Sequence, residues 1–164
     1  MAKNTSKMQI WHKIIRELSL ARISYVMVGA AALAIHGFPR STLDIDIYVP
    51  AKENILKKLF KITHALSLRS EQKAILKISH SPELFTGQWI CFSCEGQDVL
   101  DVFLANSSEF KKLYKNSKLK KDKSISIRVA SLRDIAAMKK SSGRPIDLSD
   151  LDSIKEMMRY KKKK

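Results

Sequence analysis

The sequence is poor in the features that mark secreted and membrane proteins. Its two cysteines, Cys91 and Cys94, provide no disulfide framework. No apolar run approaches the roughly 18 residues that a membrane-spanning helix needs. The opening residues, MAKNTSKMQIWHK, contain no apolar segment resembling a signal peptide. We therefore expect a cytoplasmic protein that does not engage a membrane.

Acidic residues are also scarce. There are 16 Asp and Glu against 31 Lys and Arg, which gives a net charge of +15. Part of this excess lies in runs at residues 111–115, 118–123 and 161–164. It favours a polyanionic partner, nucleic acid or polyphosphate, although a merely solvated lysine-rich surface is equally well supported. Because lysine outnumbers arginine, general electrostatic attraction is favoured over sequence-specific readout.

The length and the apolar content predict one globular domain. The chain has 164 residues, of which 45% are apolar, enough to bury a core. We expect a core over about residues 8–130, a helical part over about 131–160 and a basic tail at 161–164. Apolar periodicity predicts helices at 8–20, 30–35, 51–66, 107–114 and 132–141, with a last helix from about 147. Strands are expected at 25–28, 43–49, 74–78, 88–94, 98–104 and 124–129, and a lysine-rich loop precedes the last of these. This order predicts an α/β or α+β fold with a mixed sheet flanked by helices.

Residues 25–50, YVMVGAAALAIHGFPRSTLDIDIYVP, carry two neighbouring acids in an expected strand. Strand alternation places Asp44 and Asp46 on one face, with Leu43, Ile45 and Ile47 on the other. Adjacent carboxylates repel each other unless a positive charge lies between them. Magnesium favours carboxylate and phosphate oxygens as ligands. The pair therefore predicts a divalent cation site.

A third carboxylate is expected on a later strand, in the segment QDVLDVFL. Its two acids, Asp98 and Asp101, are three residues apart and should face opposite sides of a strand. Asp101 lies between two apolar residues, where an unpaired carboxylate is costly to bury. Asp98 lies beside the expected hairpin turn, where it would be solvated. Asp101 is therefore the preferred third acid, and Asp98 is the alternative.

These segments resemble the signature of the nucleotidyltransferase-fold (DNA polymerase β-like) superfamily. The signature combines Gly29-Ala30 at a strand end, a helix, the loop HGFPRST and the strand that carries Asp44 and Asp46. One departure is Ala30, where the family usually has Gly or Ser. Alanine fits the space but cannot donate a side-chain hydrogen bond to a phosphate.

The segment SLRDIAAMKKSSGRPIDLSDLDSI resembles a second block of small members of that superfamily. Those members include the abortive-infection (AbiEii-type) toxins of type IV toxin–antitoxin systems and some antibiotic nucleotidyltransferases. The matching residues are Lys139, Arg144, Asp147 and Asp150. In a simpler structural role, the two cations would stabilise a helix C-terminus, and the two acids would cap the last helix or pair with Arg144.

The resemblance implies transfer of a nucleoside monophosphate from an NTP to an acceptor hydroxyl, with release of pyrophosphate. Asp44, Asp46 and Asp101 would hold Mg²⁺ or Mn²⁺, and Asp101 would also deprotonate the acceptor. The implied nucleotide-binding residues are Gly29, Ala30, Arg40, Ser41, Thr42, Lys139 and Arg144.

The acceptor and the catalytic status remain open at this stage. The charge of +15 favours RNA, such as tRNA, or a protein, such as a cognate antitoxin, over a cationic aminoglycoside. The alternative from another class is a non-catalytic nucleotidyltransferase-like domain that binds nucleic acid or a partner protein. A zinc site is not expected, because the lone CxxC of Cys91 and Cys94 has no second pair of ligands nearby.

Overall fold

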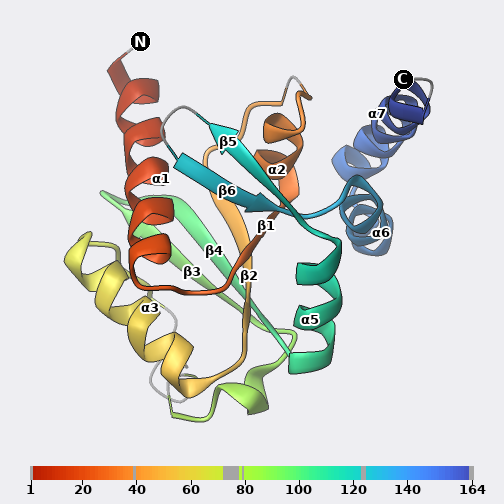
Figure 1. The fold of residues 1–164 in the computed structure, drawn as a ribbon. Helices are drawn as coiled ribbons and strands as arrows, with labels where there is room; N and C mark the ends of the chain where they lie inside the picture. Colours follow the sequence, from red (N-terminus) through yellow and green to blue (C-terminus); the bar gives the residue numbers. More distant parts are fainter. Residues whose placement is uncertain (1, 39, 72–77, 79, 123–124, 163–164) are drawn as a thin grey trace.

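The computed structural model describes residues 2–38, 40–71, 78, 80–122 and 125–162 (Figure 1). The elements follow one another as α1 (Ala2–Leu20), β1 (Val26–Val28), α2 (Gly29–Ile35), β2 (Ile45–Pro50), α3 (Glu53–Ala65), the 3-10 turn η1 (Pro82–Phe85), β3 (Trp89–Cys94), β4 (Gln97–Ala105), α5 (Ser107–Asn116), β5 (Lys118–Asp122), β6 (Ile125–Val129), α6 (Leu132–Ser142) and α7 (Pro145–Lys162). Within this part of the chain, no helix combines the length and apolarity needed to cross a membrane.

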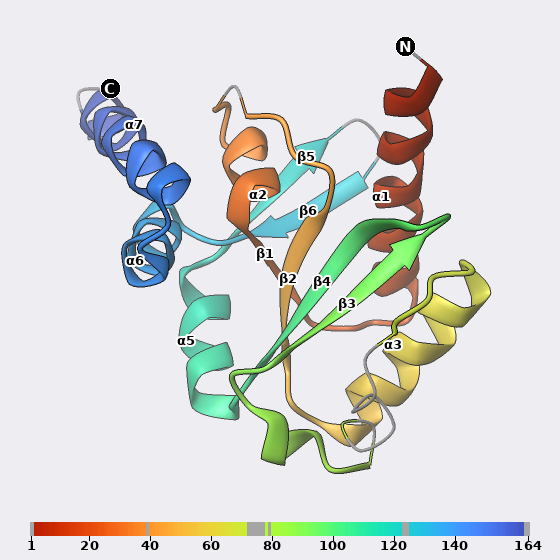
Figure 2. The ribbon, with the colours of Figure 1, turned by 180° about the vertical axis from the view of Figure 1, so that it is seen from behind.

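One mixed sheet organises these elements. Its strand order is β3-β4-β2-β1-β6-β5. The pairs β1–β6 and β2–β4 are parallel, and β1–β2, β3–β4 and β5–β6 are antiparallel. Helices α1 and α3 lie next to each other, whereas α6 and α7 lie on the opposite side of the molecule from α3 (Figures 1 and 2). The expected mixed α/β fold is confirmed.

The core forms where the apolar side of the sheet meets α1. On β2, Ile45, Ile47 and Val49 alternate with less buried residues and are each 0% exposed. They join buried residues of α1, including Ile14 and Leu18, in one apolar cluster. Because side chains alternate along a strand, one side of β2 packs in the core and Asp46 lies on the other side.

The lysine-rich loop predicted before residue 124 is wrong, because its residues form β5. This strand pairs antiparallel with β6 and lies at the edge of the sheet. The sequence KLKKD hides the strand, since it lacks apolar alternation. Lysines are a common way to protect an edge strand from pairing with other chains. The strand expected at 74–78 lies almost wholly outside the described residues.

Two end signals define the helices α6 and α7. Ser131 accepts a hydrogen bond from Asp134 N, as expected of the N-cap of α6. Gly143 ends α6 with φ +65°, a left-handed conformation that glycine adopts at low cost. Helix α7 begins at Pro145, two residues earlier than expected, since proline is well suited to the first position of a helix.

Candidate active site

The junction of β1 and α2 has no room for a side chain at Gly29. Its φ is +69°, and an added Cβ would lie 2.0 Å from Asp46 Oδ2. Asp46 is the register partner of Val28 across the β1–β2 pair, which sets its carboxylate against the first residue of α2. Glycine thus allows both the left-handed backbone and the close approach of the carboxylate.

Asp101 lies level with Asp46 on the neighbouring parallel strand. The two residues are register partners between β2 and β4, so their side chains leave the same face of the sheet. Asp101 Oδ1 is buried and has no hydrogen-bond partner among the described residues. Such an oxygen is costly to bury unsatisfied. This oxygen is therefore available to coordinate a cation or to accept a hydrogen bond from a ligand.

Asp44 completes an electrostatic group of three acids. It lies one residue before β2, where Thr42 Oγ1 donates a hydrogen bond of 2.8 Å to Asp44 Oδ1. Its charge contributes to the raised pKa of both Asp46 and Asp101. The strand expected from residue 43 begins only at Ile45, so Leu43 lies before it and is 59% exposed.

The pKa values show that nearby cations do not compensate these acids. Burial, followed by the charges of Asp44 and Asp101, raises the pKa of Asp46 to about 7, although Arg144 and Lys139 partly oppose this shift. Burial also raises the pKa of Asp101, against a hydrogen bond with the Cys91 thiol. Added positive charge would therefore favour the ionised form of both carboxyl groups.

A β-bulge changes the expected position of Asp98. Cys91 pairs with Asp101 and Ser93 pairs with Asp98, which leaves Val99 as an extra residue on β4. Asp98 and Asp101 therefore project to the same side, contrary to the prediction of opposite sides. Asp98 is exposed at the start of β4. Burial, followed by Asp101 and Asp98, raises the pKa of the Cys91 thiol to about 12.

Helices α6 and α7 are joined by a buried ion-pair network. Lys139 Nζ lies 2.7 Å from Asp147 Oδ1 and 2.7 Å from Asp150 Oδ2. Arg144 Nε lies 2.6 Å from Asp147 Oδ2, which also accepts from Ser142 Oγ. Burial alone would raise the pKa of Asp147, but hydrogen bonds from Arg144, Lys139 and Ser142 hold it well below its usual range.

The network reaches the acid site through two arginines. Arg40 Nη1, in the loop before β2, lies 3.6 Å from Asp150 Oδ1 and so links that loop to α7. The Arg144 side chain is 71% exposed, and its pKa is raised by Asp147 and to a lesser degree by Asp46 and Asp44. Arg144 is therefore an accessible cation within electrostatic reach of the acids.

The residues expected to bind nucleotide thus occupy two settings. Gly29 and Ala30 begin α2, directly after β1, and Ser41 and Thr42 lie in the loop before β2. Lys139 belongs to the buried network, because its ammonium contacts two carboxylates. The sequence suggested pairing of Asp147 with Arg144, which is confirmed, but it gave no sign of the Lys139 contacts.

The architecture is similar to that of solved nucleotidyltransferase structures. Among solved structures, the chain is similar to a "putative nucleotidyltransferase" from Thermotoga maritima, with 14% identity and a TM-score of 0.57 over 98% of this chain and 95% of that one. It is also similar to an antigenic nucleotidyltransferase-like protein from Paracoccidioides brasiliensis, with 14% identity and a TM-score of 0.55 over 89% and 72% of the two chains. At this identity the likeness concerns the fold alone.

The family follows from the sequence profile. The profile described as nucleotidyltransferase of unknown function (DUF6036) matches residues 10–159. The chain therefore belongs to this nucleotidyltransferase family, and the resemblance to the superfamily is confirmed. A search of curated proteins gives no match. The closer resemblance to AbiEii-type toxins stays a prediction.

Proposed function

We propose that this protein is a metal-dependent nucleotidyltransferase that moves a nucleoside monophosphate from an NTP to an acceptor hydroxyl and releases pyrophosphate. The observation that carries the proposal is the grouping of Asp44, Asp46 and Asp101 beside Gly29. Burial, followed by the charges of Asp44 and Asp101, raises the pKa of Asp46 to about 7. Perturbed acids of this kind are characteristic of functional sites.

The donor atoms at this site suit Mg²⁺ or Mn²⁺. The available ligands are carboxylate oxygens, including the buried Oδ1 of Asp101 that lacks a partner among the described residues. Magnesium is usually bound by one or two carboxylates together with substrate phosphates. No group of three or more His, Cys, Asp or Glu side chains in the described part of the chain is arranged to hold a metal ion. We therefore propose that the NTP supplies the remaining ligands.

The chain's own residues would hold the substrate and move the proton. Asp44 and Asp46 would bind the cation, which when present stabilises charge on the phosphoryl oxygens. Asp101 would accept the proton of the acceptor hydroxyl, since its raised pKa makes it a stronger base than an ordinary aspartate. Gly29 leaves room for the Asp46 carboxylate at the start of α2.

Phosphate binding would come from the loop before β2 and from α6–α7. Arg144 is exposed and matches phosphate oxygens with its planar guanidinium. Arg40, Ser41 and Thr42 would contact the triphosphate from the loop. Because Lys139 already contacts two carboxylates, we assign it an electrostatic influence rather than a direct phosphate contact.

The acceptor is proposed to be RNA, such as tRNA, or a protein, as in toxin-like members of the superfamily. The net charge of +15 supports a polyanion over an aminoglycoside. An adjacent gene for a small regulator would support an antitoxin partner.

Transfer of labelled nucleotide tests the proposal. Wild-type protein with Mg²⁺ and labelled NTP should label an acceptor, and Asp44→Asn with Asp46→Asn should reduce labelling by at least about 10³-fold. The matched control is Asp152→Asn, an exposed acid of α7. Label on RNA, protein or a small molecule identifies the acceptor. Undiminished transfer by the double variant would contradict the assignment.

A second candidate is a non-catalytic domain of the same fold that binds nucleic acid or a partner protein. The observation in its favour is that two cations expected to hold phosphate, Lys139 and Arg40, already contact acids of α7. Ala30 further weakens the expected phosphate contacts. Failure of every NTP to bind in the presence of Mg²⁺ would favour this candidate.

A further inference from the structure

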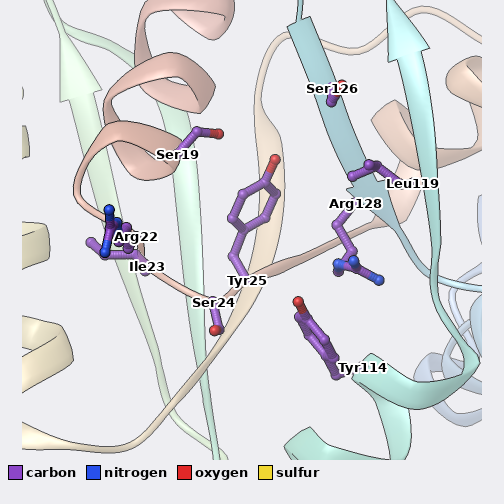
Figure 3. A pocket seen from close by; sticks show the side chains of 9 residues that line it. All are labelled: Ser19, Arg22, Ile23, Ser24, Tyr25, Tyr114, Leu119, Ser126 and Arg128. Carbon is purple, nitrogen blue, oxygen red and sulfur yellow. The ribbon is translucent and has the colours of Figure 1, made fainter.

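A hollow with a volume of about 300 Å³ opens near the start of β1, at the other end of that strand from the acid site (Figure 3). Its walls come from the end of α1, the segment before β1, α5, β5 and β6. The polar residues that matter here are Arg22, Ser24, Tyr25, Tyr114, Ser126 and Arg128. The side chains of Tyr25, Tyr114 and Arg128 gather in Figure 3. No described residue that lines the hollow is acidic.

Arg128 is held in a defined orientation. Its guanidinium lies 4.2 Å from the centroid of the Tyr114 ring, and its Nη1 donates a hydrogen bond of 3.3 Å to Ser117 Oγ. A guanidinium has five N–H donors in a planar fork. The ring contact restrains the plane of the fork without using those donors. Arg128 can therefore donate to a phosphate while keeping its present contacts.

The other walls suit the same ligand. Arg22 lies in the turn after α1 and is exposed, which adds a second cation at the rim. Ser24 and Ser126 supply hydroxyl groups, and Tyr114, which is 36% exposed, supplies an aromatic ring. A single-stranded nucleic acid matches this arrangement. Its phosphates can contact the arginines, and its unpaired bases can stack on an aromatic side chain.

The surrounding charge indicates a polymer rather than a single phosphate. Residues 110–133 contain nine Lys or Arg and one Asp, so they contribute +8 of the net charge of +15. They include the end of α5, all of β5 and β6, which are elements that also line the hollow. Edge protection accounts for lysines on β5. It does not account for an arginine held against a tyrosine inside a polar hollow.

Arg128, on one side of the hollow, projects from the same face of the sheet as the acids. Met27 is level with Val129, so Arg128 projects to the same side as Val26 and Val28. Asp46 is level with Val28 and projects to that side too. With strands about 4.8 Å apart and a rise of about 3.3 Å per residue, the Cα atoms of Arg128 and Asp46 are roughly 12 Å apart. A strand held in the hollow reaches the acids within a few nucleotides.

We propose that this hollow, together with the lysines of α5 and β5, binds backbone phosphates of single-stranded RNA. That the bound strand is the acceptor rests on the nucleotidyl transfer proposed above. RNA binding itself requires neither metal nor NTP.

The test is fluorescence anisotropy with a labelled 12-nucleotide oligouridylate, in EDTA and without NTP. Arg128→Gln and Arg22→Gln should each weaken binding roughly tenfold and lower the salt slope by about 1. Arg159→Gln, an exposed arginine of α7, is the charge-matched control and should bind normally. Because Arg22 is exposed, Arg22→Gln is expected to fold normally, so a loss of binding in this variant cannot be attributed to misfolding. Thermal unfolding checks the fold of each variant.

Equal weakening by Arg159→Gln would show diffuse charge attraction alone and would overturn the proposal. Competition by UMP or inorganic phosphate at the same phosphate concentration as the oligonucleotide would identify a small phosphate ligand and would also overturn it. Asp44→Asn with Asp46→Asn should leave RNA binding intact. If wild-type protein transfers no label but the arginine variants lose RNA, the transfer proposal fails and this one stands. If transfer occurs and those variants bind RNA normally, this proposal fails alone.

Discussion

The molecule contains two groups of poorly exposed aspartates in opposite electrostatic settings. Asp46 lies among other acids, and its pKa is raised to about 7. Asp147 is more deeply buried, at 2% exposure, yet its pKa is held well below the usual range by Lys139, Arg144 and Ser142. Burial raises the pKa in both cases, so the partners decide the outcome. The paired group joins two helices, whereas the uncompensated group is poised to accept a cation.

The largest expected loss of stability comes from removing the cation of the paired group. Lys139→Met leaves Asp147 and Asp150 without their shared cation and should lower the free energy of unfolding by about 3–5 kcal/mol. Lys140→Met, the exposed neighbour, should change it by less than about 0.5 kcal/mol. Urea denaturation measures both. Similar losses in the two variants would contradict the structural role assigned to Lys139.

The next largest effect on stability compares two glycines that have nearly the same φ angle. Gly29→Ala should lower the free energy of unfolding by about 2–3 kcal/mol, because φ is +69° and the new Cβ would meet Asp46 Oδ2. Gly143→Ala, with φ +65° and nothing within 4 Å of its Cβ, should cost about 1 kcal/mol from backbone strain alone. Thermal or urea unfolding gives the difference. Equal costs would mean that the Asp46 carboxylate does not lie against Gly29.

The pH dependence of stability separates the two groups directly. A raised pKa means that the native state holds the Asp46 proton when the unfolded chain has lost it, so stability falls as pH rises from about 4 to about 7 in metal-free protein. Asp46→Asn should reduce this slope, leaving the part due to the raised pKa of Asp101, and should stabilise the protein by about 1–3 kcal/mol at pH 8, with little change at pH 4. Asp147, whose pKa is lowered, has the opposite sign: its contribution is present above about pH 4 and lost as pH falls.

Urea unfolding in EDTA from pH 4 to pH 8 provides this measurement. Asp152→Asn serves as the exposed control and should follow the wild type. A slope in Asp46→Asn as steep as that of the wild type would show that Asp46 does not contribute to it.

The smallest expected effect tests the link between the two groups. Arg144→Gln should change the free energy of unfolding by less than about 1 kcal/mol, because the side chain is 71% exposed. Since Arg144 partly lowers the pKa of Asp46, its removal should move the Asp46 titration to higher pH. The pH profile of unfolding records this shift, and a shift to lower pH would refute the electrostatic contact.

Local patterns were sufficient for the acid site but not for its surroundings. The run from Tyr25 to Pro50 predicted β1, α2 and β2, because apolar alternation and a strand-ending glycine are encoded within a few residues. Asp101 could be chosen as the third acid because it interrupts an apolar strand, but its register with Asp46 follows only from the pairing of β2 with β4. Strand β5 was missed because its lysines leave no apolar alternation. The strand is stabilised by its pairing with β6, which the local sequence does not reveal.

Other errors have equally physical causes. The side chosen for Asp98 was wrong because one extra residue, Val99, shifts the register, and a bulge leaves no mark in the apolar pattern. The contacts of Lys139 with Asp147 and Asp150 span two helices, so spacing along one helix does not reveal them. The hollow near β1 draws residues from five segments and has no local signature.

Calorimetric titration of each NTP, with Mg²⁺ and with EDTA, tests the central claim most directly. For wild-type protein, at least one NTP should bind only in the presence of Mg²⁺, and the pH of the experiment should affect affinity near the raised pKa of Asp46, about 7. Asp44→Asn with Asp46→Asn should abolish this binding while the folded state persists. Binding that needs no metal, or that survives in the double variant, would contradict the assignment of these acids to a metal and nucleotide site.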